Sequence, residues 1–153
     1  MHLTITNKAK NVDTKTIKRA TAFYADSLMR NHEKIDLYLD FEKDLQKNYK
    51  DEGWIVAEGG NRYTITLDPK FSKRKILIAL AHEMVHLKQY HSRKFTYNKQ
   101  NKMHRFNGKS YREGMNYWNR PWEIEAFGRE LGLYRMFMEY NKNEFSISSK
   151  HIS

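Results

Sequence analysis

The sequence contains no cysteine and no long hydrophobic run. Without cysteine the chain cannot form a disulfide framework, which fits a reducing compartment. A membrane-spanning helix needs about 18 or more consecutive apolar residues, and no such stretch is present. Residues 1–10 are polar and basic and lack the apolar segment of a secretory signal. We therefore expect a soluble, cytoplasmic protein with no membrane partner.

Composition limits the chain to one domain of modest size. It has 153 residues, of which 39% are hydrophobic, enough for one core but not for two. After Asn141 the sequence becomes polar and rich in serine. We expect a single α+β domain over residues 1–145 and a flexible tail over residues 146–153.

One short motif carries most of the chemical information. His82, Glu83 and His86 form an HExxH sequence. Residues four apart lie on the same face of a helix, so the two histidines can direct ring nitrogens at one metal ion. Glu83 lies one step around the helix, where its carboxylate can accept a proton from a metal-activated water. The motif therefore predicts a zinc site with Glu83 as general base.

The residues around the motif support this interpretation. An apolar run at residues 76–81 leads directly into it, and Leu87 follows it. The pattern predicts a mostly buried helix, in which two histidines and a glutamate are costly without partners. The alternative is that both histidines are core residues whose ring nitrogens are satisfied by hydrogen bonds.

A catalytic zinc ion has three protein ligands and one open position, so a third ligand must come from elsewhere in the chain. His91 is five residues after His86, which rotates it off the ligand face, and no glycine separates the two. The extended HExxHxxGxxH pattern is therefore absent. Residues 121–127 begin a second expected helix and carry two carboxylates, Glu123 and Glu125. We expect the third ligand there.

The two glutamates are two positions apart, so on a helix they point to nearly opposite sides. Glu125 shares its side with Gly128 and Gly132, which could allow a close approach to the HExxH helix. Glu123 shares its side with three large residues that suggest a core stripe: Phe127, Leu131 and Tyr134. This pattern favours Glu125 as the ligand and leaves Glu123 as the alternative.

These motifs resemble those of compact zinc metallopeptidases of the ImmA/IrrE and SprT-like groups, and most closely those of phage-encoded metallopeptidases. The shared features are the HExxH sequence, the Phe106-Asn107-Gly108-Lys109 hairpin and the Pro121-Trp122-Glu123-Ile124-Glu125-Ala126 helix start. The resemblance covers residues 54–135.

The resemblance implies a minimal zincin-like fold, gluzincin-like in its third ligand, and hydrolysis of peptide bonds in a protein or peptide substrate. It implies that His82 and His86 bind Zn²⁺, that Glu83 is the catalytic base, and that the glutamate before Ala126, which is Glu125, is the third ligand. For a phage-encoded protein the location would be the host cytoplasm.

Two features of the related groups are missing. SprT-like repair proteases often carry a cysteine zinc ribbon, and this chain has no cysteine. ImmA-type proteins commonly adjoin a helix-turn-helix domain, and none is evident here. The resemblance therefore supports the chemistry of the site and not a particular substrate.

A net charge of +10 suggests a polyanionic partner, either nucleic acid or an acidic protein. Basic residues are dense between positions 93 and 109, and aromatic residues alternate with them, as in surfaces that bind phosphates and stack bases. A solvated basic loop packed by a few aromatics is the plainer interpretation. The alternative function is thus a basic nucleic-acid-associated or regulatory binding protein with a structural or degenerate zinc site.

The order of expected elements is an N-terminal helix, a small three-stranded sheet, the HExxH helix, a hairpin-containing connection and a C-terminal helix. Asp13 or Thr14 is expected to cap the first helix and Ser72 the HExxH helix. In the connection, His104, Tyr111 or Tyr117 could stabilise an oxyanion. The expected bounds are a helix at 12–29, strands at 34–41, 54–58 and 62–68, a connection at 92–120 with a turn at 107–108, and a helix at 122–140.

Overall fold

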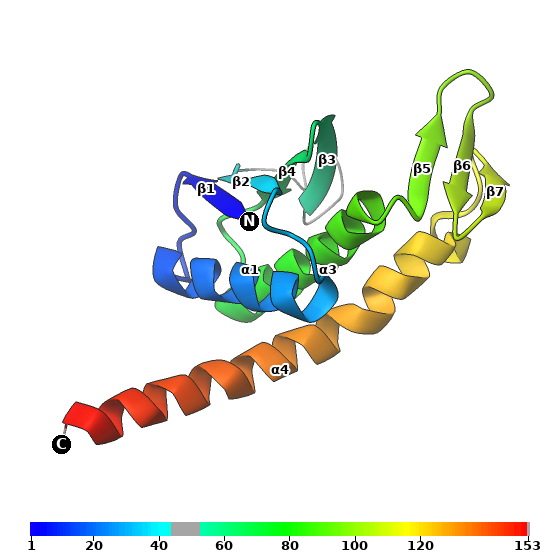
Figure 1. Ribbon diagram of the computed structural model, residues 1–153. Helices are drawn as coiled ribbons and strands as arrows, with labels where there is room; N and C mark the ends of the chain where they lie inside the picture. Colours follow the sequence, from blue (N-terminus) through cyan, green and yellow to red (C-terminus); the bar gives the residue numbers. More distant parts are fainter. Residues whose placement is uncertain (44–52, 153) are drawn as a thin grey trace.

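The computed structural model describes residues 1–43 and 53–152, with side chains as far as residue 143. In this part of the chain the protein is a mixed α+β structure with two separate sheets (Figure 1). The larger sheet has the strand order β1-β2-β4-β3. Its strands are β1 His2–Thr6, β2 Asp36–Phe41, β4 Arg62–Leu67 and β3 Gly53–Gly59.

The larger sheet is mixed. Strands β1 and β2 are parallel, β2 and β4 are parallel, and β3 pairs with β4 as an antiparallel hairpin. The turn of this hairpin contains three positive φ values, 88° at Gly59, 60° at Gly60 and 63° at Asn61. This confirms the hairpin expected from the Gly-Gly-Asn sequence. Because β3 is at the end of the strand order, one of its edges has no neighbouring strand in the described part of the chain.

In residues 1–43 and 53–152, three α-helices accompany the sheet, with α1 and α3 between the sheet and α4 (Figure 1). Apolar side chains from the sheet and all three helices form one buried core. A short 3-10 helix, η1, precedes α4. The bounds are α1 Thr14–Leu28, α3 Lys73–His91, η1 Tyr117–Asn119 and α4 Pro121–Ile152.

Both expected helix caps are present. An oxygen of Asp13 accepts a hydrogen bond from the Thr16 amide at 2.6 Å, and the Ser72 hydroxyl accepts one from the Lys75 amide at 3.2 Å. Such caps satisfy amide groups that have no partner within the helix. The Ser72 cap fixes where α3 begins and therefore the register of the HExxH residues along it.

The second sheet is a three-stranded antiparallel meander with the order β5-β6-β7. Asn107 and Gly108 form its second turn with φ values of 50° and 83°, which confirms the expected hairpin. Aromatic side chains of this sheet pack on Trp122 of α4. The strands are β5 Phe95–Asn98, β6 Met103–Phe106 and β7 Lys109–Arg112.

Three expectations about the fold need correction. The larger sheet has four strands and not three, because residues 2–6 add a parallel strand beside β2. The connection at 92–120 contains a three-stranded sheet and not only a hairpin. Helix α4 continues to Ile152, beyond its expected end at residue 140. Within the described residues, no helix has the length and apolar character needed to cross a membrane.

Candidate metal centre

Helix α3 presents His82, Glu83 and His86 at its buried face, where their residues are 8%, 7% and 8% exposed. The four-residue spacing brings the two imidazoles together edge to face, and their Nε2 atoms lie 3.2 Å apart. Most of the other buried residues of α3 are apolar and belong to the core. The sequence prediction that these three residues share a buried helix is confirmed.

Glu123, in the first turn of α4, completes the cluster. Its Oε1 lies 2.7 Å from Nε2 of His86, and its Oε2 lies 3.6 Å from Nε2 of His82. The ligand atoms of the three residues all lie within 4.8 Å of one another. Two histidines and one glutamate are the ligand set of several catalytic zinc sites.

The expectation that Glu125 faces the histidines is wrong. Glu125 instead forms an ion pair with Lys88 of α3, with 3.0 Å between Nζ and Oε1. The argument from the glycines fails as well, because a Cβ atom added at Gly128 or Gly132 would meet nothing within 4 Å. These glycines face open space and mark no close helix contact.

The side of α4 that contacts α3 contains Glu123, Ala126, Leu133 and Phe137, all buried. These positions are three, seven and four residues apart, as expected for one helix face. The sequence therefore carried a signal for Glu123, which shares its stripe with an alanine and two buried hydrophobic residues. The signal was obscured because the large residues beside Glu123 were interpreted as core, whereas Phe127 and Leu131 are 39% and 42% exposed.

Each histidine is held by a hydrogen bond at its other ring nitrogen. His82 Nδ1 donates to Glu130 Oε2 at 2.8 Å, and His86 Nδ1 donates to Gln89 Oε1 at 2.8 Å. The Gln89 amide is oriented in turn, because its Nε2 donates to the Trp122 carbonyl at 3.0 Å. With Nδ1 protonated, each neutral ring has its lone pair on Nε2, the atom that faces the cluster.

Sequence analysis missed both partners. Gln89 follows His86 by three residues and Glu130 follows Glu123 by seven, so each shares a helix face with a cluster residue. Helix periodicity could have suggested them. Only the packing of α4 on α3 shows that their side chains reach the histidine rings.

The two histidine nitrogens are spaced as ligands of a tetrahedral zinc ion would be. Two ligand atoms at about 2.0–2.1 Å from such an ion are about 3.3 Å apart, close to the 3.2 Å between the two Nε2 atoms. Two Nε2 lone pairs at this distance repel each other unless a proton or a metal ion lies between them. Among the described residues, Glu123 Oε2 is buried without a hydrogen-bond partner. His82, His86 and Glu123 would hold the ion.

The electrostatics of the cluster favour positive charge. Burial lowers the pKa of His82, but its interactions with Glu123 and Glu130 outweigh burial and raise the pKa to about 10. The pKa of His86 is also raised, because Glu123 and Glu83 outweigh burial. Burial raises the pKa of Glu123, but the two histidines lower it to about 2. The carboxylates thus stabilise a cation, either protons on the histidines or a metal ion.

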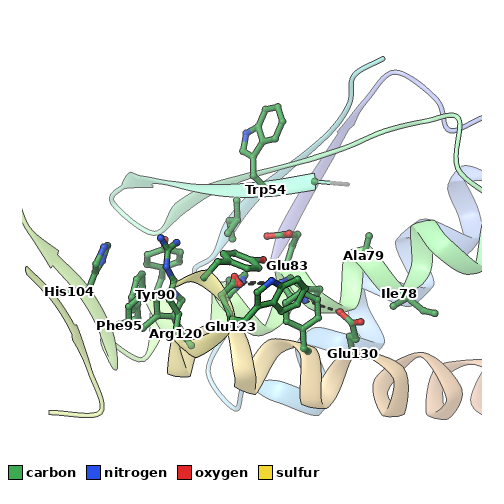
Figure 2. Close-up of a pocket in the computed structure, with 18 of the residues that line it drawn as sticks. Trp54, Ile78, Ala79, Glu83, Tyr90, Phe95, His104, Arg120, Glu123 and Glu130 are labelled. Carbon is green, nitrogen blue, oxygen red and sulfur yellow. Dashed lines mark hydrogen bonds and ion pairs between the residues drawn. The ribbon is translucent and has the colours of Figure 1, made fainter. Parts of the chain in front are cut away.

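A cleft of about 860 Å³ opens onto the cluster (Figure 2). Strand β3 borders it through Gly53, Trp54 and Ile55, and α3, α4 and η1 supply most of the remaining wall. Tyr90, two turns of α3 after His82, also lines the cleft and was not singled out from the sequence. Burial raises the pKa of the Tyr90 hydroxyl, and the charges of Glu83 and Glu123 raise it further, so this hydroxyl keeps its proton.

No family model matches this chain, and no curated protein or solved structure is significantly similar to it. The resemblance to compact zinc metallopeptidases therefore stays a sequence expectation. What can be argued about the site comes from its own residues and their geometry.

The other residues considered from the sequence lie in varied places. His91 is remote from the cluster, with its Nε2 2.8 Å from the carbonyl of Asn31. His104 and Tyr117 line the cleft. Tyr111 packs on Trp122 with 5.8 Å between ring centroids and is not part of the lining.

The aromatic residues of the basic segment at 93–109 are used mainly for internal packing. Phe95 and Phe106 are buried against Trp122, whereas Tyr97 is 42% exposed. The exposed Arg105 lies on the other face of this sheet, where it is opposite Ser110. A nucleic-acid partner for this segment remains a prediction.

Proposed function

We propose that the protein is a zinc-dependent metallopeptidase in which His82, His86 and Glu123 bind the metal ion and Glu83 acts as the general base. One observation carries the proposal. Two histidine Nε2 atoms and a carboxylate oxygen lie within 4.8 Å of one another, close enough to bind one metal ion. The Nδ1 atom of each histidine forms a hydrogen bond with a side-chain acceptor. This arrangement is typical of metal-binding histidines and uncommon for core histidines.

The open side of the cluster supports a catalytic site over a structural one. Structural zinc sites are closed by four protein ligands, whereas catalytic sites have three and leave a position for water. Within the described residues the cluster has three ligands, His82, His86 and Glu123, and all three line the cleft. A small molecule or a peptide can therefore reach the ligand atoms.

Strand β3 supports a peptide as the substrate. Its outer edge has no neighbouring strand among the residues that the structure describes, and its first residues, Gly53, Trp54 and Ile55, border the cleft. An extended peptide can add to such an edge through backbone hydrogen bonds. Figure 2 shows the strand that carries Trp54 passing over Glu83 and Glu123. A peptide paired with this strand would therefore have a peptide bond close to the cluster.

The chemistry divides between the metal ion and the chain. When bound, zinc supplies a Lewis acid that polarises a carbonyl oxygen and makes water a nucleophile near neutral pH. Glu83 is buried at the cluster and lines the cleft, so its carboxylate can accept the proton of the attacking water and return it to the leaving amine. Tyr90 offers a protonated hydroxyl in the same cleft, which can donate to a developing oxyanion.

Glu83→Gln is the direct test. We expect the zinc-loaded variant to keep its zinc, because Glu83 is not a ligand, and to lose at least about 100-fold in the rate of peptide cleavage. Cleavage is measured by mass spectrometry on a mixed peptide library, with zinc content measured on the same sample. Glu139→Gln, an exposed change on α4, is the matched control.

The proposal fails if the zinc-loaded wild-type protein cleaves no peptide in the library. It also fails if Glu83→Gln cleaves as fast as the wild type. A binding protein with a structural zinc site would retain its function after this substitution.

A further inference from the structure

Arg120 is an unusual member of the cleft lining. The chain carries a net charge of +10, yet Arg120 is the only lysine or arginine among the described residues that line the cleft. The other charged residues there are acidic, namely Glu83, Glu123 and Glu130. The basic character of the whole protein therefore does not explain this arginine, since the rest of the excess positive charge lies outside the cleft.

The position of Arg120 is fixed by the start of α4. Its carbonyl accepts hydrogen bonds from the amides of Glu123 and Ile124, both at 3.0 Å. Any residue can provide this carbonyl, so the backbone does not require an arginine. A cation is unfavourable at this end of a helix, where the dipole is positive and Ser, Thr, Asp or Asn are preferred. An arginine that is unfavourable for the stability of the helix start indicates that its side chain has a function.

The guanidinium group is held but not neutralised. Its Nε donates to the Met115 carbonyl at 3.4 Å, and its central carbon lies 5.5 Å from the ring centroid of Tyr117. Among the residues that the structure describes, no carboxylate lies within 4 Å of it. Arginine has five N–H donors, so four remain for another partner. Two of them can donate parallel hydrogen bonds to the two oxygens of a carboxylate.

His104 adjoins this group. Figure 2 shows Arg120 and His104 on one side of the cleft, on the far side of Glu123 from Glu130. The His104 ring stacks on Phe95 with 5.5 Å between centroids and lies 5.0 Å from the ring of Trp122. Burial and the charge of Arg120 lower its pKa, so the ring is neutral and is not a second fixed charge.

We propose that Arg120 forms a carboxylate-binding subsite of the cleft, with His104 beside it, and that the substrates are peptides with a carboxylate on this side of the bond that is cut. The proposal rests on the proposed peptidase function. The carboxylate can belong to an aspartate or glutamate side chain or to the C-terminus of the substrate. Both present the same two oxygens to the guanidinium group.

A peptide fits this subsite better than a nucleic acid. Nucleic-acid binding depends on several cations that follow a phosphate backbone, and the cleft has one arginine beside three glutamates. A polyanion would be repelled by Glu83, Glu123 and Glu130. A peptide with a single carboxylate meets Arg120 without that repulsion and can still pair with β3.

The test uses the full-length protein with Glu83→Gln, which prevents turnover, and compares binding of matched peptides by NMR. The probes are acetylated, amidated hexapeptides with one glutamate at each position in turn, the same series with glutamine, and a glutamine hexapeptide with a free C-terminus. We expect at least one carboxylate peptide to bind about tenfold more tightly than its neutral match and to shift the Arg120 Nε–H signal. The peptide that does so identifies the source of the carboxylate.

Three substitutions in this background separate the side chain from the net charge. Arg120→Gln should reduce the preference for the carboxylate peptide over its neutral match to about twofold or less. Arg120→Lys should retain part of this preference, because lysine keeps the positive charge but cannot donate two parallel hydrogen bonds from a planar group. Arg105→Gln, on the outer face of β6, removes the same charge outside the cleft and should leave the preference unchanged.

The proposal is overturned if no carboxylate peptide is preferred, if the preference survives Arg120→Gln, or if a thymidine oligonucleotide displaces the peptides at equal concentration. Each titration is run with and without zinc, since Arg120 does not bind the metal. A preference that persists in a protein that never binds zinc would support the subsite and contradict the peptidase. Zinc binding and peptide cleavage without any carboxylate preference would support the peptidase and contradict the subsite.

Discussion

Helices α3 and α4 take part in two buried regions of opposite character. In the apolar region, Phe137 of α4 is fully buried and packs on Phe23 and Tyr24 of α1, and the Tyr24 hydroxyl donates to the Leu77 carbonyl of α3 at 3.0 Å. In the polar region, the same two helices bury His82, His86 and Glu123 against one another, and the half-buried Glu130 contacts His82.

The difference shows which region serves the fold and which serves the function. Burial of hydrocarbon stabilises the folded chain by about 25 cal/mol per Å², so the apolar region needs no other explanation. Burial of charged groups costs free energy unless they are paired, and an apolar replacement of such a cluster is often as stable. We therefore attribute the buried charged groups of the polar region to ligand binding and not to stability of the fold. The predictions below change one region and leave the other intact.

Phe137→Ala should have the largest effect on stability. Truncation of a fully buried phenylalanine leaves a cavity and costs about 3–5 kcal/mol of the free energy of unfolding. Urea unfolding followed by circular dichroism measures this, and Phe137→Leu should cost less. The zinc content of the folded fraction should not change, because no cluster residue contacts Phe137. Loss of zinc in folded Phe137→Ala would show that the two regions are not independent.

Glu130→Gln should have an intermediate effect, confined to the polar region. The variant weakens the hydrogen bond that orients His82, and we expect zinc affinity to fall about 10-fold to 100-fold, as is typical for such outer partners. Competition with a chromophoric chelator measures the affinity. Glu139→Gln on the same helix is the control. Unchanged affinity in Glu130→Gln would mean that this hydrogen bond does not prepare His82 for the metal.

The metal-free protein should lose stability as the pH rises, by an amount on the order of 1 kcal/mol. The pKa of His82 is raised from 6.5 to about 10, so its contribution is complete below 6.5 and is lost as the pH rises through 10. The lowered pKa of Glu123 acts at the other extreme, where its contribution is lost as the pH falls through about 2. Unfolding with a chelator at about pH 7 and pH 10 tests this. His82→Gln should show a smaller loss, and an equal loss would contradict the account.

The apolar region and the HExxH helix could be predicted from sequence because their signals are local. The apolar run at 76–81, the Ser72 cap and the four-residue histidine spacing all lie within one helix. The hairpin turns were predicted for the same reason, since residues such as Asn107 and Gly108 favour positive φ wherever they occur.

The features that were missed depend on how distant segments pack. Strand β1 pairs with β2 across more than 30 residues, and its short alternation of Leu3 and Ile5 is too weak to be recognised alone. The choice between Glu123 and Glu125 depends on which side of α4 faces α3. Large residues beside Glu123, such as Phe127 and Leu131, are exposed although they resemble core residues in the sequence. Only the contact between α3 and α4 shows which glutamate faces the histidines.

The identity of the third ligand is the central claim, and zinc stoichiometry tests it most directly. Wild-type protein, His86→Ala, Glu123→Ala and Glu125→Ala are stripped with a mild chelator, reloaded with zinc, desalted and measured by elemental analysis. The account predicts one zinc per chain in the wild type and in Glu125→Ala, which loses only the ion pair with Lys88, and none in His86→Ala or Glu123→Ala. Zinc retained by Glu123→Ala and lost from Glu125→Ala, or absent from the wild type, would contradict it.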